Sequence, residues 1–345
     1  MSADALALAI RRLAAGASLS TDETAEAFDV IMRGDATAAQ VAAVLMALRV
    51  KGETAAEVAG GARALRHAMV RLPATDPDSL VDTCGTGGGT VPTFNISTAA
   101  ALLAAGAGVR IAKHGNRSFT SRCGSADVLE ALGVAIEVPV EAMRLALERA
   151  GIVFMFAPLM HPAMRHVGPV RRELAIGTVM NVLGPLANPA GAGRQVVGVA
   201  EEHRLPLLAG ALAALGSVHA LVVHGEPGMD EISPLGCTRV VEVRGGTTRE
   251  WVIDPRELGL RIASADELAG GSPEENARVI LDVLSGRGTQ GARDAVLLNA
   301  AAAMYVAGRA ASFEEALGGA RRALEAGKGV EALERLRKAV VSGGQ

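Results

Sequence analysis

Residues 113–117 read KHGNR and follow a short apolar run, 109–112, where a strand is predicted to end. Lys113 is one of only four lysines in the chain. Its neighbours are a histidine, an asparagine and an arginine: His114, Asn116 and Arg117. Two cations in one loop, followed by the hydroxyl-rich segment SFTSRCGSAD (118–127), suit a phosphate group. A lone Lys-His pair is usually a solvated basic turn, so this interpretation depends on the neighbouring segments.

A glycine-rich segment, CGTGGGT (84–90), follows the preceding predicted strand. Its glycines free the backbone to turn tightly and to point several N–H groups at one anion. The segment NIST (95–98) then opens a predicted helix, whose N-terminus also attracts anions. Neither the Walker A pattern nor the dinucleotide-binding pattern is present. An ordinary turn and helix cap explain each segment separately, but the two segments together favour a phosphate site.

Two later segments carry charge. HPAMRHVGPVRRELAIG (161–177) is a predicted helix with three arginines and an interruption at Pro169. One arginine suits a carboxylate ligand, whereas surface ion pairs are the simpler explanation for the other two. HGEPGMDEISPLG (224–236) places Asp230 and Glu231 side by side in a loop. Adjacent acids near phosphates suit Mg²⁺, although such pairs are more often merely solvated.

The elements that position these segments are read from hydrophobic periodicity. Residues 3–70 show helical spacing only. Beyond residue 80, helices alternate with short apolar strands, predicted at 80–85, 109–115, 135–138, 152–157, 195–200 and 219–225. This alternation predicts a parallel sheet covered by helices, which binds ligands at the carboxyl ends of its strands. A hairpin is predicted at 238–254, and three helical segments are predicted to end the chain.

The fold class expected is therefore α/β, with a small N-terminal helical domain and a larger domain around a mostly parallel sheet. The segment RLPATDPDS (71–79) is the predicted boundary, because its prolines and short polar residues are typical of a linker. We assign residues 1–72 to the helical domain and 73–345 to the α/β domain. The helices near 161–182 are expected to pack with the helical domain.

Composition limits the partners. The net charge of −3 provides no general field for nucleic acid, so a polyanionic ligand needs a local site. The longest apolar run has 11 residues, against the ~20 that a membrane span needs. The N-terminus lacks a secretory pattern, and three widely spaced cysteines suit a reducing compartment. We expect a cytoplasmic protein that binds neither membrane nor nucleic acid.

In their order and spacing, the segments resemble the anthranilate phosphoribosyltransferase family. The likeness rests on GTGG, NIST, KHGNR, CGSADVLEALG, HPAMRHVGPVRREL, NVLGPLANP and DEIS. It implies a nucleoside phosphorylase/phosphoribosyltransferase-like fold, a homodimer, and Mg²⁺-dependent transfer of phosphoribose from phosphoribosyl pyrophosphate (PRPP) to anthranilate in tryptophan biosynthesis. Pyrophosphate is the second product.

The resemblance also implies site residues. Those carried over as catalytic are Lys113, Asn116 and Arg171. Those carried over to PRPP are Gly85, Gly88, Gly89, Thr93, Asn95, Ile96, Ser97, Thr98, Lys113, His114, Gly115, Asn116, Arg117, Ser121 and Ser125. Anthranilate contacts are carried over to Gly85, Asn116 and Arg171, and metal ligands to Ser97, Asp230 and Glu231.

Two departures from the family pattern concern the glycine-rich loop. Gly89 stands where the family usually has Asp, and Pro92 where it has a polar residue. Both affect the expected metal dependence and substrate affinity. Two alternatives are a pyrimidine-nucleoside phosphorylase, which would show Lys-His-Ser-Thr-Gly-Gly and a longer C-terminal domain, and a non-catalytic nucleic-acid-binding relative, which would show a basic surface.

Overall fold

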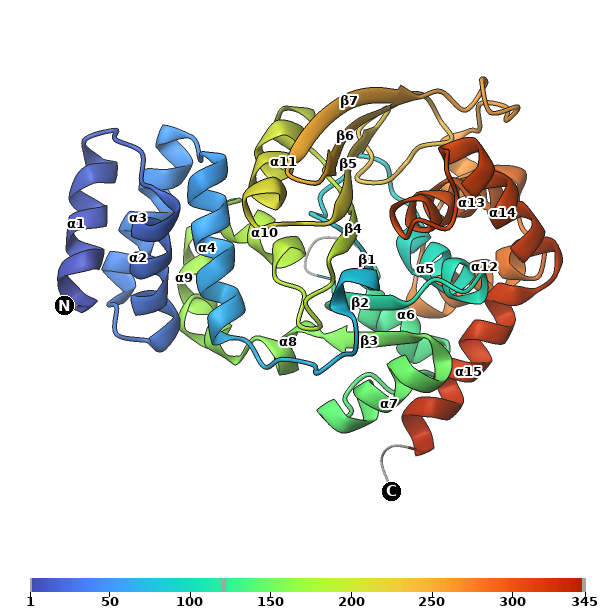
Figure 1. Ribbon diagram of the computed structural model, residues 1–345, viewed down its shortest axis with the longest axis horizontal. Helices are drawn as coiled ribbons and strands as arrows, with labels where there is room; N and C mark the ends of the chain where they lie inside the picture. The colour runs from blue at the N-terminus through green and yellow to red at the C-terminus, as the bar shows by residue number, and fades with distance from the viewer. Residues whose placement is uncertain (1, 119–121, 343–345) are drawn as a thin grey trace.

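The computed structural model describes residues 2–118 and 122–342 of the chain. Four helices come first, at the blue end of Figure 1: α1 (Ser2–Ala14), α2 (Thr21–Arg33), α3 (Ala38–Lys51) and α4 (Ala55–Ala68). The last three begin at capping boxes built on Ser20, Thr37 and Thr54. A capping box satisfies N–H groups that the helix itself leaves unpaired. The helical character predicted for this part of the chain is confirmed.

A seven-stranded sheet occupies the middle of the molecule (Figure 1). Its order is β3-β2-β1-β4-β5-β6-β7, in which β1 to β5 run parallel and β6 and β7 antiparallel. The strands are β1 (Val81–Gly85), β2 (Ile111–Gly115), β3 (Ile152–Phe156), β4 (Arg194–Gly198), β5 (His219–Gly225), β6 (Thr238–Arg244) and β7 (Thr247–Ile253). The predictions of a mostly parallel sheet and of a hairpin at 238–254 are confirmed.

Two details of the predicted elements are wrong. Residues 135–138 form no strand, although Ile136 is buried. Burial alternates along this segment, as the sequence pattern suggested, but β3 forms the edge of the sheet and pairs only with β2. The described chain ends in four helices rather than three: α12 (Pro273–Leu284), α13 (Gln290–Val306), α14 (Phe313–Glu325) and α15 (Lys328–Ser342).

The remaining helices connect the strands. The α-helices are α5 (Ile96–Gly106), α6 (Ser125–Ala131), α7 (Val140–Ala150), α8 (Ala157–Met160), α9 (Gly168–Leu174), α10 (Met180–Leu183) and α11 (Leu205–Ala214). Short 3₁₀ turns lie at η1 (Pro77–Ser79), η2 (Pro162–His166), η3 (Gly184–Leu186), η4 (Glu202–Arg204) and η5 (Ala265–Leu268). The predicted arginine-bearing helix is therefore two elements, η2 and α9, because Pro169 sits in the first turn of α9.

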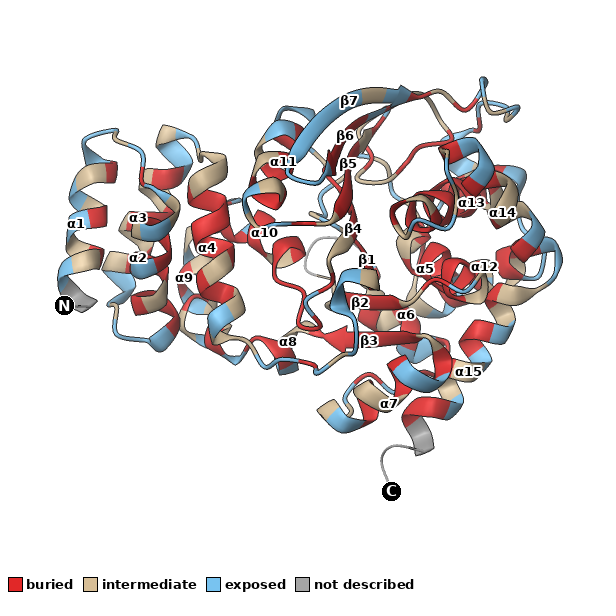
Figure 2. Ribbon diagram, viewed as in Figure 1, coloured by how far each residue is buried: buried red, intermediate tan, exposed pale blue. Residues whose placement is uncertain are grey.

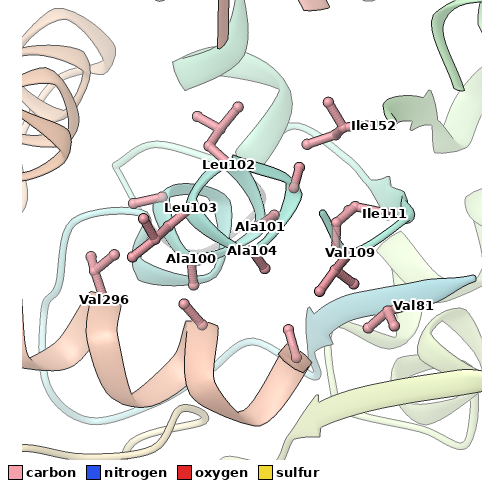
Figure 3. Packing of buried hydrophobic residues seen from close by; sticks show 14 of the residues in the cluster. Val81, Ala100, Ala101, Leu102, Leu103, Ala104, Val109, Ile111, Ile152 and Val296 are labelled. Atoms are coloured by element: carbon pink, nitrogen blue, oxygen red, sulfur yellow. The ribbon is translucent and has the colours of Figure 1, made fainter. Parts of the chain in front are cut away.

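Each face of the sheet has its own core, and the buried strands and helices are red in Figure 2. Val196 belongs to one core and the next residue, Val197, to the other, because successive strand side chains point to opposite faces. Helices α5 and α12–α15 cover the first face. Figure 3 shows α5 end-on, with Val81 on β1 and Val296 on α13 flanking it.

The four N-terminal helices and α11 share the core on the second face. The elements η2, α9 and α10 contact α2, α3 and α4. Where one domain ends and the other begins stays a prediction. None of the helices in the described residues combines the length and apolar character that a membrane span requires.

The strand order changes direction between β1 and β4. The chain proceeds from β1 to β2 and β3 on one side, whereas β4 and β5 extend the sheet on the other. Gly85 and Gly198 end these two central strands in register with each other. In open α/β sheets ligands bind at such a switch point, beyond the carboxyl ends of the strands.

Candidate functional site

The region beyond the carboxyl ends of the central strands, where the strand order reverses, is called the switch-point site below. Lys113 lies in it, near the end of β2, and is only 4% exposed. Its Nζ donates to the carbonyl and the hydroxyl of Thr83 on β1 and to Ser97 Oγ, at 3.2 Å, on α5. Burial lowers the pKa of this ammonium, while the negative charge of nearby Asp82 acts in the opposite direction. A lysine cation is thus held between β1, β2 and the start of α5.

Asp230 and Glu231, called the acid pair below, lie near this lysine and come from the other half of the sheet. Glu231 follows β5, and its Oε1 accepts a hydrogen bond of 3.1 Å from the backbone N–H of Ser97. The neighbouring Asp230 accepts one of 2.9 Å from the N–H of Gly87 in the glycine-rich loop. The structure therefore brings together the glycine-rich loop, NIST, Lys113 and the acid pair, which are far apart in sequence.

Burial and mutual repulsion disfavour the ionised forms of the acid pair. Burial, followed by the charge of Asp230, raises the pKa of Glu231 to about 8, and Lys113 only partly offsets this. Burial also raises the pKa of Asp230. Two carboxylates and the hydroxyl of Ser97 supply hard oxygen donors, and a bound cation would stabilise their ionised forms. These residues fit Mg²⁺.

Protein ligands alone do not complete such a site. Within residues 2–118 and 122–342, no three His, Cys, Asp or Glu side chains group together to hold a metal ion. Mg²⁺ commonly takes one or two carboxylates and fills its other positions with substrate oxygens and water. The donor set therefore suits a metal that binds together with a phosphate-bearing substrate.

Glycines let Asp230 approach the sheet. A Cβ built on Gly85 would lie 2.5 Å from Asp230 Oδ2, and one built on Gly198 would collide with the carbonyl oxygen of Asp230. Gly87 and Gly88 have φ of 71° and 87°, a left-handed conformation that favours glycine. A Cβ on Gly89 would lie 3.1 Å from Asp230 Oδ1. The glycine-rich loop thus wraps the Asp230 carboxylate.

The residues of NIST have divided roles. Helix α5 begins at Ile96, whose side chain is buried in the core, and the Thr98 hydroxyl is likewise buried. Ser97 faces Lys113 and Glu231. Asn95 does not cap the helix with its side chain. Its Nδ2 donates to Cys123 O at 3.1 Å and therefore braces the loop after β2. Thr93 lies half-buried before this turn.

The loop after β2 is folded back onto α6. Ser125 Oγ donates to the Asn116 carbonyl at 3.3 Å, and a Cβ on Gly115 would collide with that hydroxyl. Arg117 turns toward α6, where it pairs with Asp127, at 3.0 Å, and with Glu130. The contact of Arg117 with PRPP stays a prediction. A phosphate group there would compete with these two acids for the guanidinium. Ser121 lies outside the described residues.

The side chain of His114 packs against His161 in the interior of the protein. It is 9% exposed, and its ring centroid lies 4.8 Å from that of His161. Burial, with a smaller effect of His161, lowers the pKa of His114 to about 3. Burial lowers the pKa of His161 to about 4. Both imidazoles are therefore neutral at pH 7.

Arg171 is on a separate element, α9, beside the helical part of the chain. Its Nη2 donates to Asn181 Oδ1 at 3.5 Å. Burial lowers the pKa of its guanidinium, and the group has no acidic partner among the described ion pairs. A half-buried cation of this kind is suited to a ligand carboxylate.

Buried polar side chains behind the site were missed by the sequence analysis. Asp82 accepts from the His114 N–H at 3.2 Å and from Asn188 Nδ2 at 2.7 Å, and burial raises its pKa to about 6. Asn276 donates to Asn95 Oδ1 at 2.9 Å. Asn299 bonds to the backbone beyond Glu231. The sequence signal that could have found such residues is a single polar residue inside an apolar run, as with Asp82 in VDTC or Asn299 in VLLNAAAA.

Comparisons with known proteins agree with this architecture. A family model described as the helical bundle domain of the glycosyl transferase family matches residues 8–69, and the a/b domain of that family matches residues 77–330. The anthranilate phosphoribosyltransferase of Rubrobacter xylanophilus is 54% identical over 327 residues, covering 95% of each chain. That of Herpetosiphon aurantiacus is 51% identical, covering 92% of this chain and 94% of the relative.

Solved structures extend the similarity to three dimensions. The anthranilate phosphoribosyltransferase of Thermus thermophilus matches with a TM-score of 0.91 and 44% identity, over 96% of this chain and 99% of that one. The Saccharomyces cerevisiae enzyme, in complex with PRPP and Mg, matches with a TM-score of 0.87 and 29% identity over 98% of both chains. The fold and the switch-point site thus define a glycosyl transferase of the bundle-plus-α/β type. Within that class, the chain belongs to the anthranilate phosphoribosyltransferase family.

Proposed function

We propose that the switch-point site transfers the phosphoribosyl group of PRPP to the amino group of anthranilate and releases pyrophosphate. One observation carries the assignment of the site. Lys113, Ser97 and the acid pair converge between the ends of β1 and β4, where a leaving group with several negative charges needs cations and N–H donors.

The pyrophosphate end of PRPP is assigned to the glycine-rich loop, the start of α5 and the loop after β2. Gly85, Gly88 and Gly89 allow the backbone to approach a phosphate closely. Lys113 supplies a positive charge that is buried from solvent. The further contacts proposed are Thr93, Asn95, Ile96, Ser97, Thr98, His114, Gly115, Asn116, Arg117, Ser121 and Ser125.

Mg²⁺ is the proposed cofactor, and Ser97, Asp230 and Glu231 are its proposed ligands. When bound, it neutralises the charge that develops on the leaving pyrophosphate. In the metal-free protein Glu231 has a raised pKa because burial and Asp230 disfavour its ionised form. A cation at this position relieves that penalty, which is why the acid pair suits metal binding.

The acceptor is assigned to the side of the site that faces the helical domain. Arg171 would bind the carboxylate of anthranilate, with Asn116 and Gly85 completing the contacts. The bond from ribose C1 to the pyrophosphate oxygen breaks, and a bond from C1 to the amine nitrogen forms with loss of one proton. Because an aromatic amine is neutral at pH 7, positioning and electrostatics can carry the reaction without a strong base.

We also propose that the protein works as a cytoplasmic homodimer in tryptophan biosynthesis. Support for a dimer comes from two exposed apolar side chains on the helical domain, Leu8, which is 48% exposed, and Val50, which is 79% exposed. The net charge of −3 supports small-molecule substrates over nucleic acid.

The test is loss of anthranilate fluorescence on addition of PRPP and Mg²⁺. The wild-type protein should consume anthranilate, and Lys113→Met should lose nearly all activity because the charge on the leaving group is no longer balanced. Lys328→Met is the matched control, since Lys328 is a partly exposed lysine paired with Glu331 at the start of α15. Absence of anthranilate consumption by the wild-type protein would refute the proposed function.

A further inference from the structure

Asn299 contacts the loop that carries the acid pair. It lies on α13, is 3% exposed, and interrupts a run of apolar side chains. Its Oδ1 accepts the N–H of Ile232 at 3.0 Å, and its Nδ2 donates to the carbonyl of Ile232 at 2.9 Å. One side-chain amide thus engages both backbone groups of the residue that directly follows Glu231.

The orientation of this amide is determined by its partners. Nδ2 also donates to Ala295 O at 2.9 Å, within α13 itself. Rotating the amide by half a turn would place Oδ1 against two carbonyl oxygens and Nδ2 against an N–H. Asn299 therefore holds the peptide groups of Ile232 in one orientation relative to α13.

This anchor is stiff because both of its ends are buried. Ile232 is completely buried, and α13 packs on α5, β1, β4 and β5. Asn299, Glu231 and Ser97 line the same internal cavity of about 10 Å³. Asn299 and Glu231 thus border one small space, and Asn299 connects the loop of the acid pair to the helix that covers the sheet.

On the other side, Asp230 is held by the Gly87 N–H and by its close approach to Gly198. Two anchors therefore bracket the acid pair, one at each end. Without the anchor at Ile232, the backbone after Glu231 could shift, and both carboxylates would move with it. Groups that orient metal ligands in this way affect affinity without touching the metal.

We propose that Asn299 is a positioning residue that sets the Asp230 and Glu231 carboxylates for divalent-metal binding, an inference that rests on the proposed metal role of that pair. It acts through the backbone of Ile232 and touches neither substrate nor metal. A purely stabilising role predicts a lower free energy of unfolding with unchanged metal affinity in the folded protein, so the two roles are separable.

The experiment measures Mn²⁺ binding by electron paramagnetic resonance, in the presence of inorganic pyrophosphate, for wild type, Asn299→Leu and Asn299→Ser. Leu keeps the branching and number of side-chain heavy atoms but removes the hydrogen bonds, and the smaller Ser leaves room for water to replace some of them. Both variants should raise the Mn²⁺ dissociation constant roughly tenfold or more, as loss of an orienting partner does. The Mg²⁺ concentration for half-maximal activity should rise in parallel.

Tyr305→Phe is the matched control, because it removes a half-buried hydrogen bond, 3.0 Å to Glu242, from the same helix. It should lower stability and leave Mn²⁺ affinity unchanged. Unchanged affinity in a folded Asn299 variant overturns the inference, as does an equal shift in Tyr305→Phe or the failure of both Asn299 variants to fold. If the wild-type protein itself binds no Mn²⁺, the proposed metal role fails and this inference falls with it.

Discussion

The carboxylate of Asp230 accepts a 2.9 Å hydrogen bond from the backbone N–H of Gly87. This contact joins the loop after β5 to the loop after β1, across the point where the strand order reverses. The glycine-rich loop therefore has two roles, since it surrounds an acidic side chain of the protein and is also the proposed cradle of a phosphate. Substitutions in this loop are expected to change the behaviour of the acid pair.

Gly89→Asp should make the enzyme bind PRPP more tightly and become inhibited by Mg²⁺ in the millimolar range. The new Cβ would lie 3.1 Å from Asp230 Oδ1, so a third carboxylate would join the acid pair. Additional metal held there overstabilises the bound ground state and raises the barrier to chemistry. The measurement is turnover against Mg²⁺ concentration for both proteins.

Gly89→Ala is the control for this substitution, because it adds the Cβ without the charge. It should retain the wild-type tolerance of Mg²⁺. Superimposable curves for wild type and Gly89→Asp would reduce Gly89 to a loop glycine.

Gly198→Ala should abolish most activity. The methyl group would collide with the carbonyl oxygen of Asp230, so the acid loop must move away from the sheet. Such overpacking typically costs about 1–3 kcal/mol of stability. Urea unfolding and Mg²⁺ dependence measure the two effects. Gly318→Ala, in the interior of α14, is the control and should be neutral or slightly stabilising. Wild-type metal dependence in Gly198→Ala would contradict the proposed contact.

Arg171→Ala should raise the KM for anthranilate and leave the KM for PRPP nearly unchanged. It removes a charge-assisted contact of about 1.5–3 kcal/mol, equivalent to roughly a ten- to hundredfold change. Steady-state kinetics with each substrate varied in turn provides the measurement. Arg172→Ala, an exposed neighbour on the same helix, should behave like wild type. A raised KM for PRPP alone would assign Arg171 to the other substrate.

His161→Gln should make folding stability less sensitive to acid. The neutral imidazole has a pKa of about 4 in the folded protein, against about 6.5 in an unfolded chain. Between these values the unfolded state binds a proton that the folded state does not, so the free energy of unfolding falls as pH drops. At pH 5 this difference in proton binding lowers the free energy of unfolding by about 2 kcal/mol. The His161→Gln variant should not show this loss.

The pH dependence of stability must be compared between wild type and His161→Gln. Asp82 and Glu231 have raised pKa values, so in both proteins they favour the folded state as pH drops, opposite to His161. Urea unfolding at pH 7 and pH 5 provides this comparison. The exposed His203→Gln is the control and should keep the wild-type dependence. Equal pH dependence in wild type and His161→Gln would show that burial does not keep this imidazole neutral.

The amino-acid sequence was sufficient to predict the classes of structure and the main chemical groups. Alternating apolar strands and helices predicted the mostly parallel sheet, because residue periodicity directly records which side chains face a core. The segments around Lys113, Ser97 and Glu231 were identified because they combine charge, hydroxyl groups and glycine at the ends of predicted strands. The family resemblance then gave each segment a role.

The sequence did not determine which partner each polar side chain chooses. Arg117 pairs with Asp127 and Glu130 on α6, and Asn95 donates to the Cys123 carbonyl, partners that the spacing of these residues did not predict. A side-chain hydrogen bond depends on direction and distance in space, and local spacing does not specify these for residues from different elements.

Tertiary structure alone decided the arrangement behind the site. Asn299 is distant from Ile232 in sequence, and only the packing of α13 on the sheet brings its amide to that backbone. Gly198 likewise acquires its importance from the loop that passes over it. Residue types and their periodicity determined the elements and the chemistry available to them, whereas long-range packing decided which of those groups meet, because contacts between distant segments exist only once the sheet has formed.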